Sequence, residues 1–154
     1  MKARHMIAAL AAAVLIVSAS LHAADEKKDP LAGLKCPISD KPVVAASATD
    51  YKGGQIYFCC KNCPKAFSKK TAKYSAKANA QLVATGQAKQ KACPISGKSK
   101  LNPETKIKVN GVAVCFCCNG CKGKVKKAKG DAQIKLVFGD KAFKQGFKVA
   151  KKEG

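Results

Sequence analysis

Beyond Ala23, the chain contains no histidine, no methionine and no arginine. The residues of these types all lie in the N-terminal stretch before that point: Met1, Arg4, His5, Met6, His22. Because histidine is the commonest general base, its absence excludes a Ser-His-Asp or Cys-His hydrolase built from residues 24–154. Any transition-metal site in that part of the chain must therefore be built from cysteine thiolates, with a hydroxyl or a carboxylate as a further donor.

The stretch from Met1 to Ala23 has the pattern of a secretory signal peptide. Lys2 and Arg4 give it a basic start, and an unbroken apolar run follows from Ile7 to Val17. This run is too short to cross a bilayer and is typical of a signal peptide. Leu21-His22-Ala23 resembles a cleavage site, so we expect a periplasmic or secreted protein with no transmembrane segment after cleavage. The alternative is an uncleaved membrane anchor.

The chain is strongly basic, and almost all of its positive charge is lysine. Its formal net charge is +21, or +19 once Lys2 and Arg4 are set aside. Such a field attracts anions, and an anionic surface of the cell envelope is one conceivable partner. Nucleic acid is not expected, because bidentate readout of guanine and phosphate favours arginine. The simpler interpretation is a solvated surface.

A four-cysteine pattern occurs twice in the chain. The first copy contains Cys36-Pro37-Ile38-Ser39 and Cys59-Cys60-Lys61-Asn62-Cys63. The second contains Cys93-Pro94-Ile95-Ser96 and Cys117-Cys118-Asn119-Gly120-Cys121. The distance along the chain from Cys59 to Cys117 is one residue longer than that from Cys36 to Cys93. Such a repeat does not arise by chance in a chain of 154 residues, and it indicates a soft-metal site or a disulfide framework.

The repeat predicts two small modules after the signal peptide. We assign residues 24–33 to a linker, residues 34–90 to the first module, and residues 91–154 to the second module with a C-terminal extension. Units of about 57 residues bury little core and usually need a metal or disulfides to stay folded. The expected fold class is small α+β, with a cysteine knuckle, a β-hairpin and a helix in each module.

The hairpins are predicted from glycine turns between alternating apolar residues. Residues 51–58 indicate one hairpin around Gly53-Gly54, and residues 107–114 indicate another around Asn110-Gly111. Residues 43–46 give a weak strand signal. We expect Cys115, whose counterpart is Tyr57, to be a free or partly buried thiol and not a ligand.

Helices are expected after both cysteine clusters. Pro64 suits a first helical turn, and apolar side chains then recur at helical spacing as far as Gly86: Phe67, Tyr74, Ala78, Leu82. In the second module, residues 122–129 predict a helix, residues 134–138 are strand-like, and residues 142–150 indicate a terminal helix interrupted by Gly146.

Three cysteines of each copy can converge on one ion. Cys59 ends a strand, Cys63 lies at a helix N-terminus that favours the thiolate form, and Cys36 approaches from across the hairpin. The expected ligands, for one ion in each module, are six cysteines: Cys36, Cys59, Cys63, Cys93, Cys117, Cys121. Since thiolates select soft ions, we expect Zn²⁺ or Cu⁺.

These residues resemble the TRASH and YHS metal-binding families. The shared features are a leading cysteine, about twenty further residues, and Phe-Cys-x3-Cys followed by an apolar helix, and they cover residues 34–70 and 91–128. The resemblance implies zinc-ribbon or treble-clef-like modules and a context of heavy-metal sensing, transport or resistance. It matches four residues of the first module position by position: Cys36, Cys59, Cys63, Phe67.

The ligand set departs from the zinc-ribbon pattern at one position. Zinc ribbons of the ribosomal type have C-x2-C at the knuckle, whereas Ser39 and Ser96 stand at that place here. A structural zinc site needs four ligands, so either Cys60 and Cys118 supply the fourth or the site stays three-coordinate. Three thiolates suit Cu⁺, and an open position suits ion exchange.

We therefore expect a non-enzymatic, exported protein that binds soft metal for storage, delivery or resistance. One alternative is a disulfide-stapled, basic binding protein of the cell envelope, although nine cysteines and adjacent pairs argue against a regular framework. Another is a thiol-disulfide oxidoreductase that uses Cys60-x2-Cys63 or Cys118-x2-Cys121, although the βαβ context of such motifs is missing.

Overall fold

The computed structural model describes residues 31–150, so the predicted signal peptide (1–23) and most of the predicted linker (24–33) lie outside the described residues. Within that range the chain forms a small α+β fold with five helices and three two-stranded antiparallel sheets. None of the helices in the described range has the length and hydropathy of a bilayer-spanning segment.

Each half of the chain places a knuckle and a hairpin before its helices, and ends in a short strand. The first half contains five elements: β1 (Val44–Tyr51), β2 (Gly54–Phe58), α1 (Asn62–Lys69), α2 (Thr71–Ala84), β3 (Ala88–Gln90). The second half contains six: β4 (Asn102–Val109), β5 (Val112–Phe116), α3 (Asn119–Lys127), α4 (Gly130–Phe138), α5 (Asp140–Gly146), β6 (Phe147–Val149).

The two hairpins have the same turn and the same register. Both central turn residues have positive φ, at Lys52-Gly53 (52° and 83°) and at Asn110-Gly111 (50° and 79°). Positive φ at both positions is the type I′ geometry, so the hairpin around Asn110-Gly111 is confirmed. The first turn is centred one residue before the predicted Gly53-Gly54. Gly54 instead begins β2, where a Cβ would come within 2.8 Å of Leu82 Cδ2.

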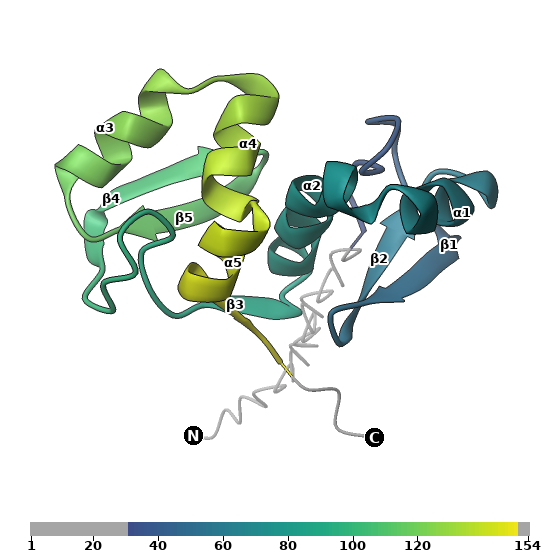
Figure 1. Ribbon diagram of the computed structural model, residues 1–154, viewed down its shortest axis with the longest axis horizontal. Coiled ribbons are helices and arrows are strands. Elements are labelled where there is room, and N and C mark those ends of the chain that lie inside the picture. The colour runs from purple at the N-terminus through teal and green to yellow at the C-terminus, as the bar shows by residue number, and fades with distance from the viewer. Residues whose placement is uncertain (1–30, 151–154) are drawn as a thin grey trace, which may run out of the picture.

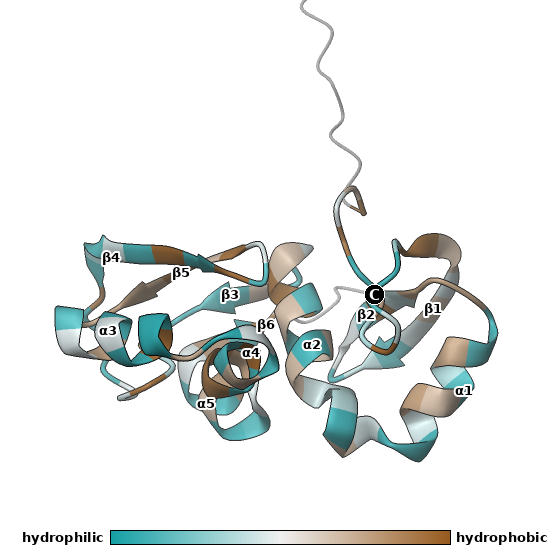
Figure 2. Ribbon diagram, turned by 90° about the horizontal axis from the view of Figure 1, so that it is seen from above, coloured by the Kyte–Doolittle hydropathy of each residue, from teal (hydrophilic) through white to brown (hydrophobic). Residues whose placement is uncertain are grey.

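The helices join the halves into one body. Helices α2, α4 and α5 lie side by side between the two hairpins, while α1 and α3 lie at opposite ends of the molecule (Figures 1 and 2). Strands β3 and β6 pair antiparallel, with Ala88 opposite Val149. The buried apolar side chains of both halves form one continuous cluster. The two halves therefore share a single hydrophobic core.

One strand prediction is wrong. Residues 134–138 belong to α4, because Ile134, Val137 and Phe138 have helical spacing and are buried where α4 packs on α2. The carbonyl of Phe138 also accepts a hydrogen bond of 2.8 Å from Asn79 Nδ2 of α2. Tertiary packing thus overrides the strand propensity of this apolar run.

Two helix predictions are correct only in part. The helix expected from Pro64 to Gly86 is interrupted at Lys70, whose φ of −138° and ψ of 42° are not helical, so it forms α1 and α2. The helix expected at residues 142–150 is α5 only as far as Gly146, after which Phe147 begins β6. Gly146 lies against the second knuckle, where a Cβ would be 2.9 Å from Pro94 Cα.

Candidate metal centres

In the first half, three cysteines meet where the knuckle, the hairpin and the helix converge. Cys36 lies in the knuckle, Cys59 follows β2 directly, and Cys63 lies in the first turn of α1. Their sulfur atoms all lie within 4.8 Å of one another, and Cys59 Sγ is 3.6 Å from Cys63 Sγ. Cys36 and Cys63 are buried and Cys59 is half-buried, so solvent reaches the cluster on the side of Cys59.

The second half repeats this cluster with Cys93, Cys117 and Cys121. Their sulfur atoms again lie within 4.8 Å of one another, and Cys117 Sγ is 3.7 Å from Cys121 Sγ. Cys93 and Cys121 are buried and Cys117 is half-buried. The structure therefore brings all six predicted ligands together in two groups of three, and these are the groups in residues 31–150 with the geometry to hold a metal ion.

The knuckles owe their shape to short backbone hydrogen bonds. The N–H of Cys36 donates to the carbonyl of Lys41 at 2.8 Å, and the N–H of Cys93 donates to the carbonyl of Lys98 at 2.9 Å. Each bond closes a tight loop that begins at the cysteine. The tetrapeptide Cys-Pro-Ile-Ser thus predicts the loop correctly in both halves.

Hydrogen bonds to sulfur lower the pKa of the two knuckle cysteines. Burial acts to raise the pKa of Cys36, but the N–H of Cys59 and the hydroxyl and N–H of Ser39 outweigh it and lower the pKa to about 7. Burial also acts to raise the pKa of Cys93, but hydrogen bonds from Ser96 and from the N–H of Cys117 outweigh it and lower the pKa to about 7. Since the thiolate is the metal ligand, each centre offers one near neutral pH.

The helix cysteines have the opposite tendency. Burial, reinforced by the neighbouring sulfurs, raises the pKa of Cys63 and raises that of Cys121 to about 12. Three thiols at this separation do not all ionise unless a cation lies among them. Metal binding at these clusters would therefore release protons.

A serine hydroxyl stands beside each cluster. Ser39 Oγ is 3.1 Å from Cys59 Sγ, and Ser96 Oγ is 3.2 Å from Cys117 Sγ. These are the two serines that the sequence places at the end of each Cys-Pro-Ile-Ser knuckle. Each hydroxyl hydrogen-bonds to a sulfur atom. The three thiols therefore remain the groups of each site with the strongest affinity for a soft metal ion.

The vicinal cysteines lie outside the groups of three. Cys60 and Cys118 are exposed. Cys60 Sγ contacts Cys63 Sγ at 3.2 Å, whereas Cys118 Sγ contacts Cys117 Sγ at 3.8 Å. The hydrogen bond with the Cys63 side chain lowers the pKa of Cys60, and that with the Cys121 backbone lowers the pKa of Cys118. As they stand, neither belongs to a set of three sulfurs close enough to share one ion.

Two glutamines fix the hairpins next to the sites, and sequence reasoning missed them. Gln81 of α2 accepts from the N–H of Tyr57 at 2.6 Å and donates to its carbonyl at 3.0 Å. Gln90 of β3 makes the same pair of bonds to Cys115, at 3.0 and 2.6 Å. Tyr57 and Cys115 are equivalent residues, two positions before the first cysteine of each cluster. Half-buried Cys115 belongs to neither group of three, in agreement with the prediction for it.

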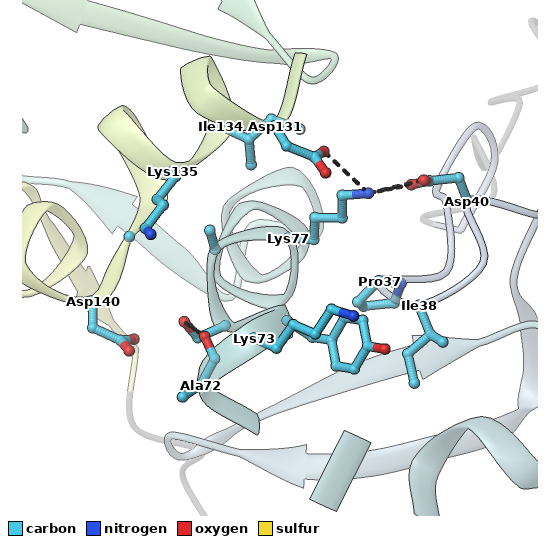
Figure 3. Close-up of a pocket in the computed structure, with 14 residues that line it drawn as sticks. Pro37, Ile38, Asp40, Ala72, Lys73, Lys77, Asp131, Ile134, Lys135 and Asp140 are labelled. Carbon is cyan, nitrogen blue, oxygen red and sulfur yellow. Dashed lines mark hydrogen bonds and ion pairs between the residues drawn. The ribbon is translucent and has the colours of Figure 1, made fainter. Parts of the chain in front are cut away.

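A cavity of about 610 Å³ lies between the halves, beside the first knuckle (Figure 3). Lys77 of α2 spans it, with its Nζ 2.8 Å from Asp40 Oδ2 and 3.2 Å from Asp131 Oδ1. Asp40 belongs to the first knuckle and Asp131 to α4. This lysine therefore ties the loop that carries Cys36 to the second half of the chain.

The arrangement of knuckle, hairpin and helix around three sulfurs thus recurs in both halves. In comparisons with protein-family models, curated proteins and solved structures, the chain has no match.

Proposed function

We propose that this chain is a soft-metal-binding protein that holds one ion in each half. The observation that carries the proposal is the recurrence of three sulfur atoms within 4.8 Å of one another, at equivalent places in both halves. Each group combines a knuckle cysteine whose pKa is about 7 with two further cysteines around it. Three thiolates at this separation repel one another, and a cation bound among them replaces that repulsion with attraction.

The donor set favours Cu⁺ over Zn²⁺. Three thiolates satisfy Cu⁺, whereas a closed zinc site needs a fourth ligand. For Zn²⁺, exposed Cys60 and Cys118 would have to turn inward, since neither belongs to a group of three. A centre with three ligands also keeps a coordination position open, which suits a protein that exchanges its ion.

The biological role that we propose is metal storage, delivery or resistance, without catalysis. The order of knuckle, hairpin and helix supports modules of the zinc-ribbon or treble-clef type and a relation to the TRASH and YHS families. The N-terminal signal pattern supports export to the periplasm or the medium. The lysine-rich composition supports contact with an anionic envelope surface.

Thiol chemistry is a second candidate, favoured by one specific observation. Cys60 Sγ lies 3.2 Å from Cys63 Sγ in a C-x2-C motif, so that these two thiols are placed to close a disulfide. A protein that works through disulfides would contain few free thiols after purification and would be indifferent to metal chelators. An oxidoreductase would also reduce insulin disulfides in the presence of a thiol donor.

Metal counting tests the proposal directly. The protein is purified under reducing, anaerobic conditions, offered Cu⁺ or Zn²⁺ separately, desalted and analysed for metal and free thiols. We expect close to two Cu⁺ ions per chain, and loss of thermal protection on removal of the ions with a strong chelator. A reduced, folded protein that retains neither Cu⁺ nor Zn²⁺ would refute the proposal.

A further inference from the structure

The second metal centre opens to solvent through a groove. Of its three sulfur-bearing residues, Cys93 and Cys121 are buried, and half-buried Cys117 lines the groove together with exposed Cys118. The groove has a volume of about 530 Å³, within the range of small-molecule sites. A molecule that exchanges metal with this centre can therefore reach Cys117 from the groove.

Two lysines and an apolar floor form the rest of the groove. Exposed Lys98 and Lys100 line it, together with Leu101 and Pro103. Lys98 has a counterpart in Lys41, since both carbonyls accept the bond that closes the knuckle. Lys100 has none.

Lys100 lies in the segment that contains the one-residue insertion of the repeat. Two residues, Pro42-Val43, separate Lys41 from Val44 in the first half, whereas three, Ser99-Lys100-Leu101, separate Lys98 from Asn102 in the second. Val44 and Asn102 are equivalent because both pair with the last residue of their hairpin. The extra position that sets the late parts of the repeat further apart thus falls at the groove.

The charges around the groove favour an anion. Residues 91–130 contain ten lysines and a single acid, Glu104. A centre of three thiolates around a monovalent ion is itself negative, so it repels an anionic ligand unless positive charge lies beside the path. Lys98 and Lys100 supply that charge, and the N-terminus of α3, which begins after Cys118, adds to it.

We propose that this groove binds a small thiol that carries carboxylates, and that its sulfur exchanges metal with Cys117. This inference rests on the proposed function, and it names the class of molecule that delivers or removes the ion. When the ion arrives, its bond to the incoming thiol sulfur breaks as a bond to Cys117 Sγ forms. The proton of Cys117 leaves with the departing thiol, and the oxidation state of the metal does not change.

The test uses the full chain loaded with Cu⁺ and reduced glutathione as the anionic thiol. Binding is followed by native mass spectrometry and calorimetry, with three comparison ligands: neutral 2-mercaptoethanol, cationic cysteamine, and S-methylglutathione, which keeps the carboxylates but has no free thiol. We expect glutathione to bind more tightly than all three. The substitutions K98E and K100E together should weaken it about tenfold or more and slow Cu⁺ transfer to a similar degree. The matched pair K106E and K108E, which changes exposed lysines of β4, should change both less than about twofold.

Each result decides one part of the inference. Equal binding of glutathione and S-methylglutathione would mean an adventitious anion only and would overturn it. So would equal effects of the two lysine pairs, or equal binding of the neutral thiol. A chain that takes up Cu⁺ but shows one of these results keeps the proposed function and loses the anionic thiol, whereas a chain that takes up no metal loses both.

Discussion

The two halves hold their sulfur atoms alike although much of what surrounds those atoms differs. The sulfur separations across the hairpin end and the helix agree closely, at 3.6 Å for Cys59–Cys63 and 3.7 Å for Cys117–Cys121. Around them, the first half has one long helix, α2, where the second has two shorter ones, α4 and α5. The part that the repeat preserves is therefore the arrangement of the three sulfur atoms.

The packing behind the ligands shows the same contrast. In the first half, Phe67 of α1 packs its ring edge-on against Tyr51 and tilted against Phe58, with centroid distances of 5.3 and 5.7 Å. In the second half, Val125 of α3 takes the place of Phe67, and Val109 that of Tyr51. Phe116, the equivalent of Phe58, is buried as well, so the second half has one aromatic ring and two valines where the first half has three rings. Both sets support the same arrangement of sulfurs, because either fills the space between hairpin and helix.

The largest expected effect comes from removing one ligand. Cys63→Ala should empty the first centre and Cys121→Ala the second, so that each variant binds one Cu⁺ in place of two. Each loses the binding free energy of one site, about 10–16 kcal/mol if it resembles structural zinc sites. Metal analysis and mass spectrometry measure the stoichiometry.

The control for ligand removal is Cys115→Ala, which should leave both centres filled because Cys115 belongs to neither group of three. Equal metal loss from Cys115→Ala and Cys63→Ala would mean that the ligands are assigned wrongly. Loss of both ions from a single ligand variant would mean instead that the halves bind metal as one unit.

The next largest effect separates the two supporting cores. Phe67→Ala should lower the free energy of unfolding by about 3–5 kcal/mol, as is usual for a buried phenylalanine. Val125→Ala should cost less, about 1.5–3 kcal/mol at most, since it removes a smaller apolar surface. Denaturant unfolding of the metal-loaded proteins gives both values. Equal losses would show that the aromatic cluster adds nothing to the first half.

Sequence reasoning found the two cysteine groups because their pattern is local. The knuckle, the Asn110-Gly111 turn and the Cys59-x3-Cys63 spacing each follow from a few neighbouring residues, whose backbone geometry leaves few choices. These short segments are enough to predict two groups of three sulfurs.

The missed features depend on contacts between distant residues. The run from Ile134 to Phe138 has strand propensity, and only its burial against α2 makes it helical. Gln81 and Gln90 make equivalent hydrogen bonds from positions that the repeat does not relate, so no comparison of the two copies could reveal them. The pairing of β3 with β6 joins segments from opposite ends of the described chain and has no local signal.

Oxidation should affect the two halves at different rates. In the metal-free protein, Cys60 and Cys63 are placed to form a disulfide, whereas the sulfur contact of Cys118 is with adjacent Cys117. Neighbouring Cα atoms are about 3.8 Å apart, below the usual range for disulfides, so a bond between adjacent cysteines is strained.

Glutathione disulfide provides the measurement, because each protein disulfide formed converts one molecule of it into two of glutathione. We expect the Cys60–Cys63 bond to form about tenfold faster than the equivalent Cys118–Cys121 bond of the second half, which corresponds to about 1.4 kcal/mol in activation free energy. Alkylation, digestion and mass spectrometry identify the bonds, and Cys60→Ser should abolish the fast phase. Equal rates in the two halves would refute the difference.

The smallest expected effect concerns the link between the first knuckle and the second half. Burial would lower the pKa of Lys77, but hydrogen bonds to Asp40 and Asp131 outweigh it and raise the pKa above the usual 10.5. A raised pKa means that the stabilisation is complete below pH 10.5 and is lost as the pH rises through the folded-state value.

Lys77→Met should therefore cost about 1 kcal/mol or less at pH 8, because both aspartates are largely exposed. The denaturant midpoints of this variant and the parent should differ at pH 8 and converge once the pH exceeds the raised folded-state pKa of Lys77. Lys65→Met, which changes an exposed lysine of α1, should leave the midpoint unchanged at both pH values. A constant difference at all pH values would show that Lys77 contributes through its aliphatic chain and not through its charge.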